Sequence, residues 1–223
     1  MMLPRPPKAV IFDMDGLLCD TEALYRDVMI ATVAEMGHEM PMPLFLSLVG
    51  MPAVVGDARV QDHLGESFDI AAWRGLVSER VAAACAVGID LKPGVIEMLD
   101  RLDALGLPRA IATSSGHPAV QAHLGPSGIL PRFNAVIADG DYSRGKPNPD
   151  PYLVAAERLG VAPEFCLALE DSYNGVRAAS AAGTMAVMIP DLLDATDEMR
   201  GLTVAIARDM HEVVGWLPEP DAH

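Results

Sequence analysis

Short apolar runs alternate with helix-like segments from residue 91 onward, and this alternation restricts the fold more than any other feature. Each run is four or five residues long and lies between turn residues, which is typical of a buried strand. The predicted strands are residues 109–113, 135–138, 165–169 and 185–189. The predicted helices are residues 95–105, 118–124, 149–159 and 172–182. Strands and helices in alternation form a parallel sheet with helices on both faces, so the sequence predicts an α/β fold.

A further buried strand is predicted at residues 8–12, near the start of the chain. The pattern then changes, because residues 17–90 contain no convincing strand. The helices predicted in this segment are residues 21–37, 43–49, 53–64 and 69–87. We therefore expect an α/β core formed by residues 1–16 and 91–223, with an all-helical domain of residues 17–90 inserted after the first strand.

The composition is that of a folded, acidic protein. Of the 223 residues, 51% are hydrophobic and 21% are charged, and the formal net charge is −15. This charge argues against nucleic acids and anionic membranes as partners. It also repels anionic substrates, so a phosphate site must be built locally from a metal, a lysine and backbone N–H groups. We favour a monomer, although no sequence feature decides the oligomeric state.

Several features indicate a cytoplasmic protein. Cys19, Cys85 and Cys166 are odd in number and lack zinc-type spacing, which is typical of reduced thiols in the cytosol. The first residues lack the apolar core of a signal peptide. The longest apolar stretch, around residues 81–89, is too short to span a bilayer.

Two carboxylates follow the first predicted strand directly, in the order Asp13-Met14-Asp15-Gly16. In an open α/β sheet, ligands bind beyond the carboxyl ends of the strands. Asp13 and Asp15 are two residues apart, so we expect their side chains to leave the strand end in similar directions. Neighbouring carboxylates repel each other, and a metal cation or a proton relieves that repulsion. Taken alone, a solvated turn explains the motif equally well.

Polar groups also end two later strands. Thr113 and Ser114 offer hydroxyls and amides that suit an oxyanion such as phosphate, with helix capping as the alternative. Glu170 and Asp171 close residues 165–169. With Asp13 and the main-chain carbonyl of residue 15, Asp171 would supply hard oxygen ligands for Mg²⁺. The alternative is an acid pair that offsets a helix dipole.

Lys146 lies in a loop just before a predicted helix. The stretch from Gly140 to Lys146 matches most of the nucleotide-binding P-loop pattern. That pattern requires Ser or Thr after the lysine, whereas Pro147 follows here and disfavours a helical conformation for Lys146. We therefore interpret Lys146 as a positive charge presented from a loop, with a solvated surface lysine as the alternative.

Taken together, the motifs of this chain resemble those of the haloacid dehalogenase-like phosphotransferase superfamily. The likeness covers almost the whole chain and rests on residues 13–22, 111–113, 145–150 and 169–175. It implies a Rossmann-like parallel sheet as the core and a small helical cap at residues 17–90. Within the superfamily, the chain is most similar to the branch that holds sugar-phosphate phosphatases and β-phosphoglucomutase.

The resemblance implies a Mg²⁺-dependent phosphatase of a small phosphorylated metabolite, such as a sugar or polyol monophosphate. Asp13 would be the nucleophile that forms an aspartyl phosphate, and Asp15 the general acid and base. Lys146 would neutralise phosphoryl charge, and Thr113 with the amide of Ser114 would bind a phosphoryl oxygen. The implied metal ligands are Asp13, Asp15, Glu170 and Asp171.

The sequence argues against dehalogenase and phosphonatase activity, two other activities of the superfamily. Its dehalogenases lack the second aspartate of the first motif, which is Asp15 here, and its phosphonatases need a cap lysine, which residues 17–90 lack. A β-phosphoglucomutase-like phosphosugar isomerase is the main alternative, because it shares the core motifs. Its cap carries an arginine shortly after a glycine, whereas residues 50–56 here are apolar and Arg59 is the first basic residue after them. This difference favours a hydrolase of a monophosphate over the mutase, and the intact motifs argue against a third possibility, an inactive binding protein.

Overall fold

The computed structural model describes residues 3–49, 51 and 53–219, and within them it confirms the predicted α/β fold. Six strands form one parallel sheet in the order β3-β2-β1-β4-β5-β6. The strands are β1 (Ala9–Phe12), β2 (Arg109–Gly116), β3 (Ala135–Asp139), β4 (Cys166–Glu170), β5 (Met185–Met188) and β6 (Ala205–Ile206). The chain adds β2 and β3 on one side of β1 and then β4 to β6 on the other. In an open α/β sheet, this change of direction marks the place where ligands bind.

Strand β1 lies at the centre of the sheet, and its four residues are wholly buried. Ile11 pairs with Ala110 of β2 and with Ala168 of β4. Burial on both faces explains why this segment is a continuous apolar run rather than an alternating one. The N–H group of Asp13 continues the pairing, since it donates to the carbonyl oxygen of Leu169 at 3.0 Å. The sheet therefore fixes the backbone position of Asp13.

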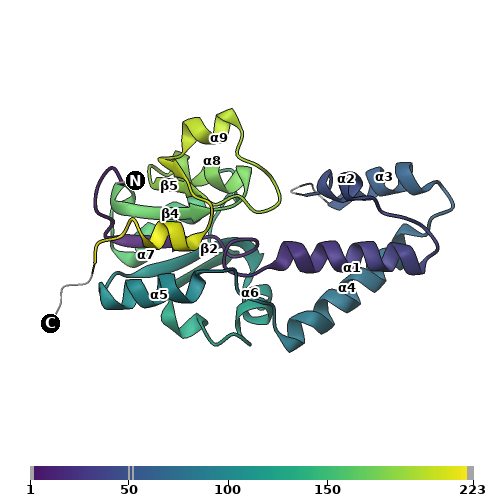
Figure 1. The fold of residues 1–223 in the computed structure, drawn as a ribbon, viewed down its shortest axis with the longest axis horizontal. Helices are drawn as coiled ribbons and strands as arrows, with labels where there is room; N and C mark the ends of the chain where they lie inside the picture. Colours follow the sequence, from purple (N-terminus) through teal and green to yellow (C-terminus); the bar gives the residue numbers. More distant parts are fainter. Residues whose placement is uncertain (1–2, 50, 52, 220–223) are drawn as a thin grey trace.

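Helices cover both faces of the sheet (Figure 1). The core helices next to the sheet are α5 (Val95–Ala104), α6 (His117–Leu124), α7 (Asp150–Leu159), α8 (Tyr173–Ala181) and α10 (Met210–Val214). α5, α6 and α10 contribute to an apolar cluster that contains large side chains such as Phe12 and Leu169. α7 and α8 contribute to a second cluster that consists mainly of alanines. Because α7 and α8 begin shortly after Lys146 and Asp171, their packing fixes the loops that carry these two residues.

The inserted segment forms helices that extend to one side of the sheet (Figure 1). They are α1 (Thr21–Glu35), α2 (Met42–Leu46), α3 (Ala53–Leu64) and α4 (Ile70–Val87). These helices share an apolar cluster that includes Val33, Phe45 and Trp73. The C-terminal part of α4 also packs into the main cluster beside the sheet, through Val81 and Cys85. The inserted helices and the α/β core thus share buried contacts. The division into two domains at residues 17–90 stays a prediction.

Several short elements were not predicted. They are α9 (Asp197–Leu202), β6, α10 and the 3₁₀ turns Leu130–Arg132 and Pro163–Phe165. Strand β6 has only two residues, so no apolar run marks it. The predicted helix at residues 43–49 is too long, because α2 ends at Leu46 and residues 47–49 form a turn. Ser47 closes the helix, since its hydroxyl donates to the carbonyl oxygen of Leu44 at 2.7 Å.

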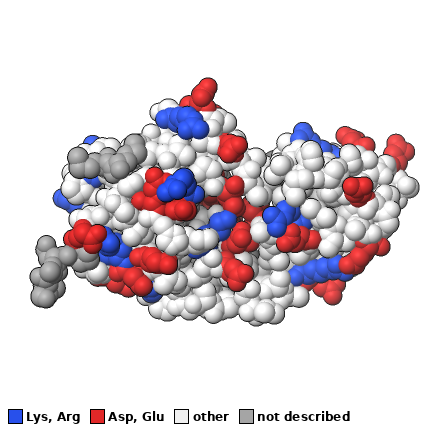
Figure 2. Space-filling view, viewed as in Figure 1, with Lys and Arg blue, Asp and Glu red and all other residues white. Residues whose placement is uncertain are grey.

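The face seen in Figure 2 carries acidic and basic side chains interspersed with one another, with no continuous basic patch on that face. That face therefore lacks the continuous basic patch that is typical of nucleic-acid binding. None of the helices that the structure describes combines the length and the apolar character that a membrane crossing requires.

Candidate active site

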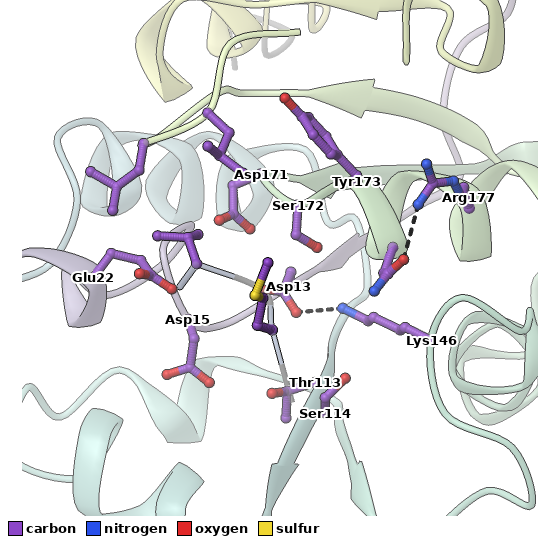
Figure 3. A pocket seen from close by; sticks show the side chains of 15 residues that line it. Asp13, Asp15, Glu22, Thr113, Ser114, Lys146, Asp171, Ser172, Tyr173 and Arg177 are labelled. Atoms are coloured by element: carbon purple, nitrogen blue, oxygen red, sulfur yellow. Dashed lines mark hydrogen bonds and ion pairs between the residues drawn. The ribbon is translucent and has the colours of Figure 1, made fainter. Parts of the chain in front are cut away.

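A cavity of about 570 Å³ lies at the carboxyl ends of the strands, between the core and the inserted helices (Figure 3). It is lined by six of the seven predicted site residues, namely Asp13, Asp15, Thr113, Ser114, Lys146 and Asp171. The seventh, Glu170, is wholly buried beside Lys146. The structure therefore brings together residues from four separate segments, while their chemical roles stay predictions.

Lys146 links the segments that follow β1 and β4. Its Nζ atom donates to Oδ1 of Asp13 and, at 2.5 Å, to Oε1 of Glu170. Burial raises the pKa of Asp13 to about 7, although the nearby Lys146 ammonium lowers it. Burial lowers the pKa of Lys146, but the carboxylates of Asp13 and Glu170 outweigh this effect and raise it above its usual value. Lys146 is therefore a fixed positive charge beside Asp13, as the interpretation of its loop predicted.

Glu170 is fully hydrogen-bonded in its buried position. Besides Lys146, its Oε1 atom accepts a hydrogen bond from the hydroxyl of Tyr152 at 2.7 Å. Its Oε2 atom accepts from the N–H groups of Asp171 and Ser172, each at 3.1 Å, and from the Ser172 hydroxyl at 3.0 Å. These contacts suit a residue that orients Lys146. Both oxygens of Glu170 already have hydrogen-bond partners. A direct bond from Glu170 to a metal stays a prediction.

The carboxylate of Asp171 is buried and incompletely hydrogen-bonded. Its Oδ1 atom is buried and has no hydrogen-bond partner, and burial together with the charge of Asp13 raises its pKa well above the usual value. The carboxylates of Asp13, Glu170 and Asp171 each offer an oxygen within 4.8 Å of the others. The absence of a side chain on Gly16 leaves room for the Asp171 carboxylate, because a Cβ atom there would lie 2.4 Å from Oδ2 of Asp171. The φ of Gly16, +83°, is also one that glycine adopts readily. This set of hard oxygen donors fits Mg²⁺.

Thr113 and Ser114 both line the cavity, while their contact with a phosphate stays a prediction. Thr113 is buried, and its Oγ1 atom accepts a hydrogen bond from the N–H group of Ser115 at 3.0 Å. Its hydroxyl proton is therefore available for a group in the cavity. The carbonyl oxygen of Thr113 accepts from the Tyr142 hydroxyl at 3.0 Å, which holds this turn in place. Ser114 is exposed and lines the cavity.

The carboxylate of Asp15 does not join those of Asp13 and Asp171. Figure 3 shows it pointing away from Asp13, and its partners are Ser115 and His123. The expected common direction of Asp13 and Asp15 is thus wrong. Strand β1 ends at Phe12, so the two-residue period of a strand no longer applies to these side chains. A metal contact through the main-chain carbonyl of Asp15 stays a prediction.

Beyond the predicted catalytic, substrate and metal residues, the cavity is lined by Glu22, Val49, Met51, Ser172, Tyr173, Asn174, Arg177, Leu192 and Leu193. Arg177 donates to Oδ1 of Asn174 at 3.0 Å, one turn earlier on α8. Glu198 holds the same guanidinium group through two hydrogen bonds of 2.7 Å. Burial raises the pKa of Glu22, which faces the cavity from α1. For Asn174 and Arg177 the sequence held a signal, because residues three apart on a helix lie on the same face and this helix follows Asp171 directly.

Comparison with protein families identifies the chain. A model of the haloacid dehalogenase-like hydrolases matches residues 7–183, a range that contains all seven predicted site residues. The chain belongs to this family. As a haloacid dehalogenase-like hydrolase with relatives named as phosphatases, it is an enzyme that hydrolyses phosphoric monoesters.

Two curated relatives cover most of this hydrolase. The protein CbbY of Cupriavidus necator is 36% identical over 219 residues, covering 89% of this chain and 84% of the relative. The phosphorylated carbohydrates phosphatase of Thermotoga maritima is 31% identical over 176 residues, covering 79% of this chain and 82% of the relative.

Solved structures show the same fold. A haloacid dehalogenase family hydrolase from Deinococcus radiodurans, with bound phosphate and sodium, has a TM-score of 0.82 at 26% identity and covers 95% of this chain and 98% of its own. A variant of CbbY from Rhodobacter sphaeroides, in complex with xylulose-1,5-bisphosphate, has a TM-score of 0.70 at 29% identity and covers 92% and 96%.

Replacement of Gly175 by alanine is expected to disturb the site of this hydrolase through Glu170. A Cβ atom on Gly175 would lie 1.7 Å from Oε1 of Glu170, so the carboxylate must move and Lys146 must move with it. We expect Gly175→Ala to lower kcat/KM for phosphate release by about 100-fold, since a misplacement of about 1 Å costs that much.

The matched control is Gly201→Ala on α9, where an added Cβ atom meets no other atom within 4 Å. This variant is expected to keep kcat/KM within about twofold, as is usual for surface changes. Equal activity of the two variants would contradict the role of Gly175 in the placement of Glu170.

Proposed function

We propose that the protein is a Mg²⁺-dependent phosphatase that hydrolyses a small sugar or polyol monophosphate through an aspartyl phosphate. The observation that carries this proposal is the placement of Asp13. It lies at the point where the strand order changes, beside the ammonium group of Lys146 and the unpartnered carboxylate of Asp171. A nucleophile, a cation and an incomplete set of metal ligands thus meet in one cavity.

The charges of the site support a divalent cation. Asp13, Glu170 and Asp171 bring three carboxylates, and Lys146 brings one ammonium group. With all three acids ionised, two negative charges remain, which is the charge that one Mg²⁺ neutralises. Asp13 and Asp171 would hold the ion, together with the main-chain carbonyl of Asp15. When bound, Mg²⁺ supplies charge neutralisation for the transferring phosphoryl group.

The residues of the chain would then divide the reaction between them. An ionised oxygen of Asp13 attacks phosphorus, and the bond from phosphorus to the leaving alkoxide breaks. Lys146 and the Thr113 hydroxyl, with the N–H group of Ser114, stabilise the non-bridging oxygens. Asp15 gives its proton to the alkoxide and later takes one from the water that attacks the aspartyl phosphate.

The cationic groups around the cavity favour a monophosphate. Among its described lining residues, the cations are Lys146 and Arg177, and Glu198 already neutralises Arg177. The Glu22 carboxylate also faces this space, and it would repel a second phosphate group. Arg59 and Arg80, on the inserted helices, are bonded elsewhere, to the Ser47 carbonyl and to Glu35. A mutase binds two phosphates, so these contacts favour a hydrolase.

Asp13→Asn is expected to abolish turnover while the fold remains intact. The amide is nearly the same size but cannot form the phosphoanhydride bond, so kcat should fall by at least about 1,000-fold. Phosphate release measures the activity, and thermal unfolding should show equal or higher stability, because burial disfavours the charged carboxylate. Asp62→Asn, an exposed residue on α3, is the control with the same chemical change. Substantial activity in Asp13→Asn would refute the covalent step.

The reaction type is tested with a β-hexose 1-phosphate, Mg²⁺ and a hexose bisphosphate primer. Because the cavity lacks a second unpaired cation among its described residues, we expect release of inorganic phosphate and free hexose. Accumulation of hexose 6-phosphate without phosphate release would show a mutase instead. A parallel screen of sugar phosphates, polyol phosphates and nucleotides identifies the leaving group.

The pKa of Asp13 predicts how metal binding depends on pH. A raised carboxyl pKa means that stability is present at low pH and is lost as the pH rises towards about 7, where the buried charge forms. Mg²⁺ binds the ionised carboxylate, so near pH 5.5 it must displace a proton that is absent near pH 8. We expect the affinity for Mg²⁺ to be about 30-fold lower at pH 5.5 than at pH 8. Because a ligand that binds the folded state raises the melting temperature, the rise caused by Mg²⁺ should be smaller at pH 5.5. An equal Mg²⁺-induced rise in melting temperature at both pH values would contradict the assignment of Asp13 as a metal ligand. An undiminished rise in the variant Asp171→Asn would contradict the assignment of Asp171.

A further inference from the structure

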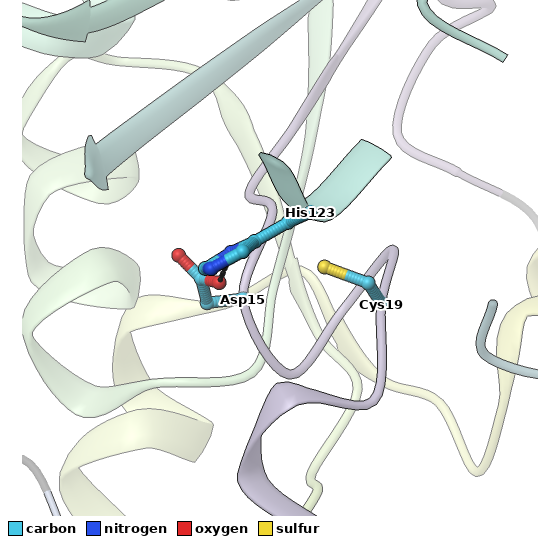
Figure 4. Close-up of side chains that lie close together, drawn as sticks. All are labelled: Asp15, Cys19 and His123. Atoms are coloured by element: carbon cyan, nitrogen blue, oxygen red, sulfur yellow. Dashed lines mark hydrogen bonds and ion pairs between the residues drawn. The ribbon is translucent and has the colours of Figure 1, made fainter. Parts of the chain in front are cut away.

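The carboxylate of Asp15 has two partners, and both come from the same strand–helix unit. The hydroxyl of Ser115, near the end of β2, donates to Oδ2 of Asp15 at 2.7 Å. The Nδ1 atom of His123, on α6, lies 2.9 Å from Oδ1 (Figure 4). Ser115 and His123 are about a hundred residues away from Asp15 in the sequence, so the fold alone creates these contacts.

His123 contacts Asp15 from outside the lining of the active-site cavity. Its side chain is 11% exposed, and it does not belong to the lining of the active-site cavity. Instead it lines a second cavity of about 660 Å³, which lies between α4 and α6. The imidazole therefore contacts the proposed acid–base group but does not line the cavity in which we propose that the phosphoryl group binds.

The chemistry of the two partners matches the task of Asp15. The proposed reaction requires this carboxyl group to be protonated in the first step and ionised in the second. A hydroxyl and an imidazole can each donate or accept a hydrogen bond, so both can hold the group in either state. The partner of Asp13 is different, because the Lys146 ammonium group can only donate and so favours the ionised nucleophile.

Cys19 lies close to the same pair but does not take part in it (Figure 4). Its thiol donates to the main-chain carbonyl of Met14 at 3.6 Å. Burial raises its pKa far above the usual value, so the thiol is uncharged at neutral pH. The hydrogen bonds to the Asp15 side chain thus come from Ser115 and His123.

We propose that His123 is a positioning residue for Asp15: its Nδ1 atom holds the carboxyl group in place for proton transfer to the leaving alkoxide. This inference rests on the proposed acid–base function of Asp15. It goes beyond that function, because it assigns a role to a buried histidine that no site motif of the chain contains. The contribution should appear only when the leaving group needs a proton.

Leaving-group dependence provides the test. The constant kcat/KM covers the steps up to departure of the leaving group, and p-nitrophenolate leaves without a proton whereas an alkoxide does not. We expect His123→Leu to lower kcat/KM for glycerol phosphate by about 10-fold to 100-fold and for p-nitrophenyl phosphate by less than about twofold.

Two conservative variants locate the effect at one ring nitrogen. In His123→Asn the side-chain amide lies near the former position of Nδ1, and in His123→Gln it lies near that of Nε2. We therefore expect Asn to restore most of the activity on the alkyl phosphate and Gln to restore little. The control is His117→Leu, the same change at the exposed first residue of α6, where the ring contacts Asp141 instead. Circular dichroism and thermal unfolding confirm that each variant is folded.

The outcomes separate this inference from the proposed function. Asp15→Asn is measured with the same two substrates, and the acid–base role fails if this variant shows no dependence on the leaving group. If Asp15→Asn shows that dependence and His123→Leu does not, the positioning role of His123 is overturned. Equal losses on both substrates in His123→Leu, or equal rescue by Gln and Asn, would also overturn it.

Discussion

The buried ammonium group of Lys146 is the contact on which the rest of the site depends. It lies between Asp13 and Glu170, and its side chain is only 5% exposed. Removal of such charges from water costs several kcal/mol per ion, and their attraction offsets this only when the remaining hydrogen bonds are also made. Glu170 meets that condition through Tyr152, Ser172 and two backbone N–H groups. The loop before α7 is thereby tied to the ends of β1 and β4.

Lys146 does not satisfy the whole group of acids. Asp171 keeps a buried oxygen without a partner, and its raised pKa shows how strongly the site disfavours another negative charge. A protein of net charge −15 also repels a phosphate ester as it approaches. One divalent cation at Asp13 and Asp171 would answer both problems, because it neutralises the carboxylates and attracts the phosphoryl oxygens. The excess of negative charge in the site is thus the physical reason for proposing metal-dependent chemistry.

Local sequence patterns were sufficient to predict five of the six strands that the structure describes and most residues that end them. A buried strand requires an apolar run, and parallel strands bring their carboxyl ends to one edge, so Asp13, Thr113 and Asp171 meet as expected. Contacts between helices were not predictable in this way. The pairing of Arg177 with Glu198 depends on how α8 and α9 pack, and no spacing in the sequence encodes it. Strand β6 is too short for any periodicity to reveal it.

The first motif shows most clearly where sequence reasoning stops. The spacing of Asp13 and Asp15 suggested a shared direction, which would have placed both carboxylates among the same partners. Strand β1 ends at Phe12, before either aspartate, and the chain turns at Gly16, whose φ is +83°. The period of a strand therefore does not apply to Asp13 and Asp15, and their carboxylates have different partners. One lies beside a lysine that can only donate, and the other beside groups that donate or accept. The ionised nucleophile and the alternating acid–base group that we propose require different partners, and the departure from strand geometry gives Asp13 and Asp15 such different partners.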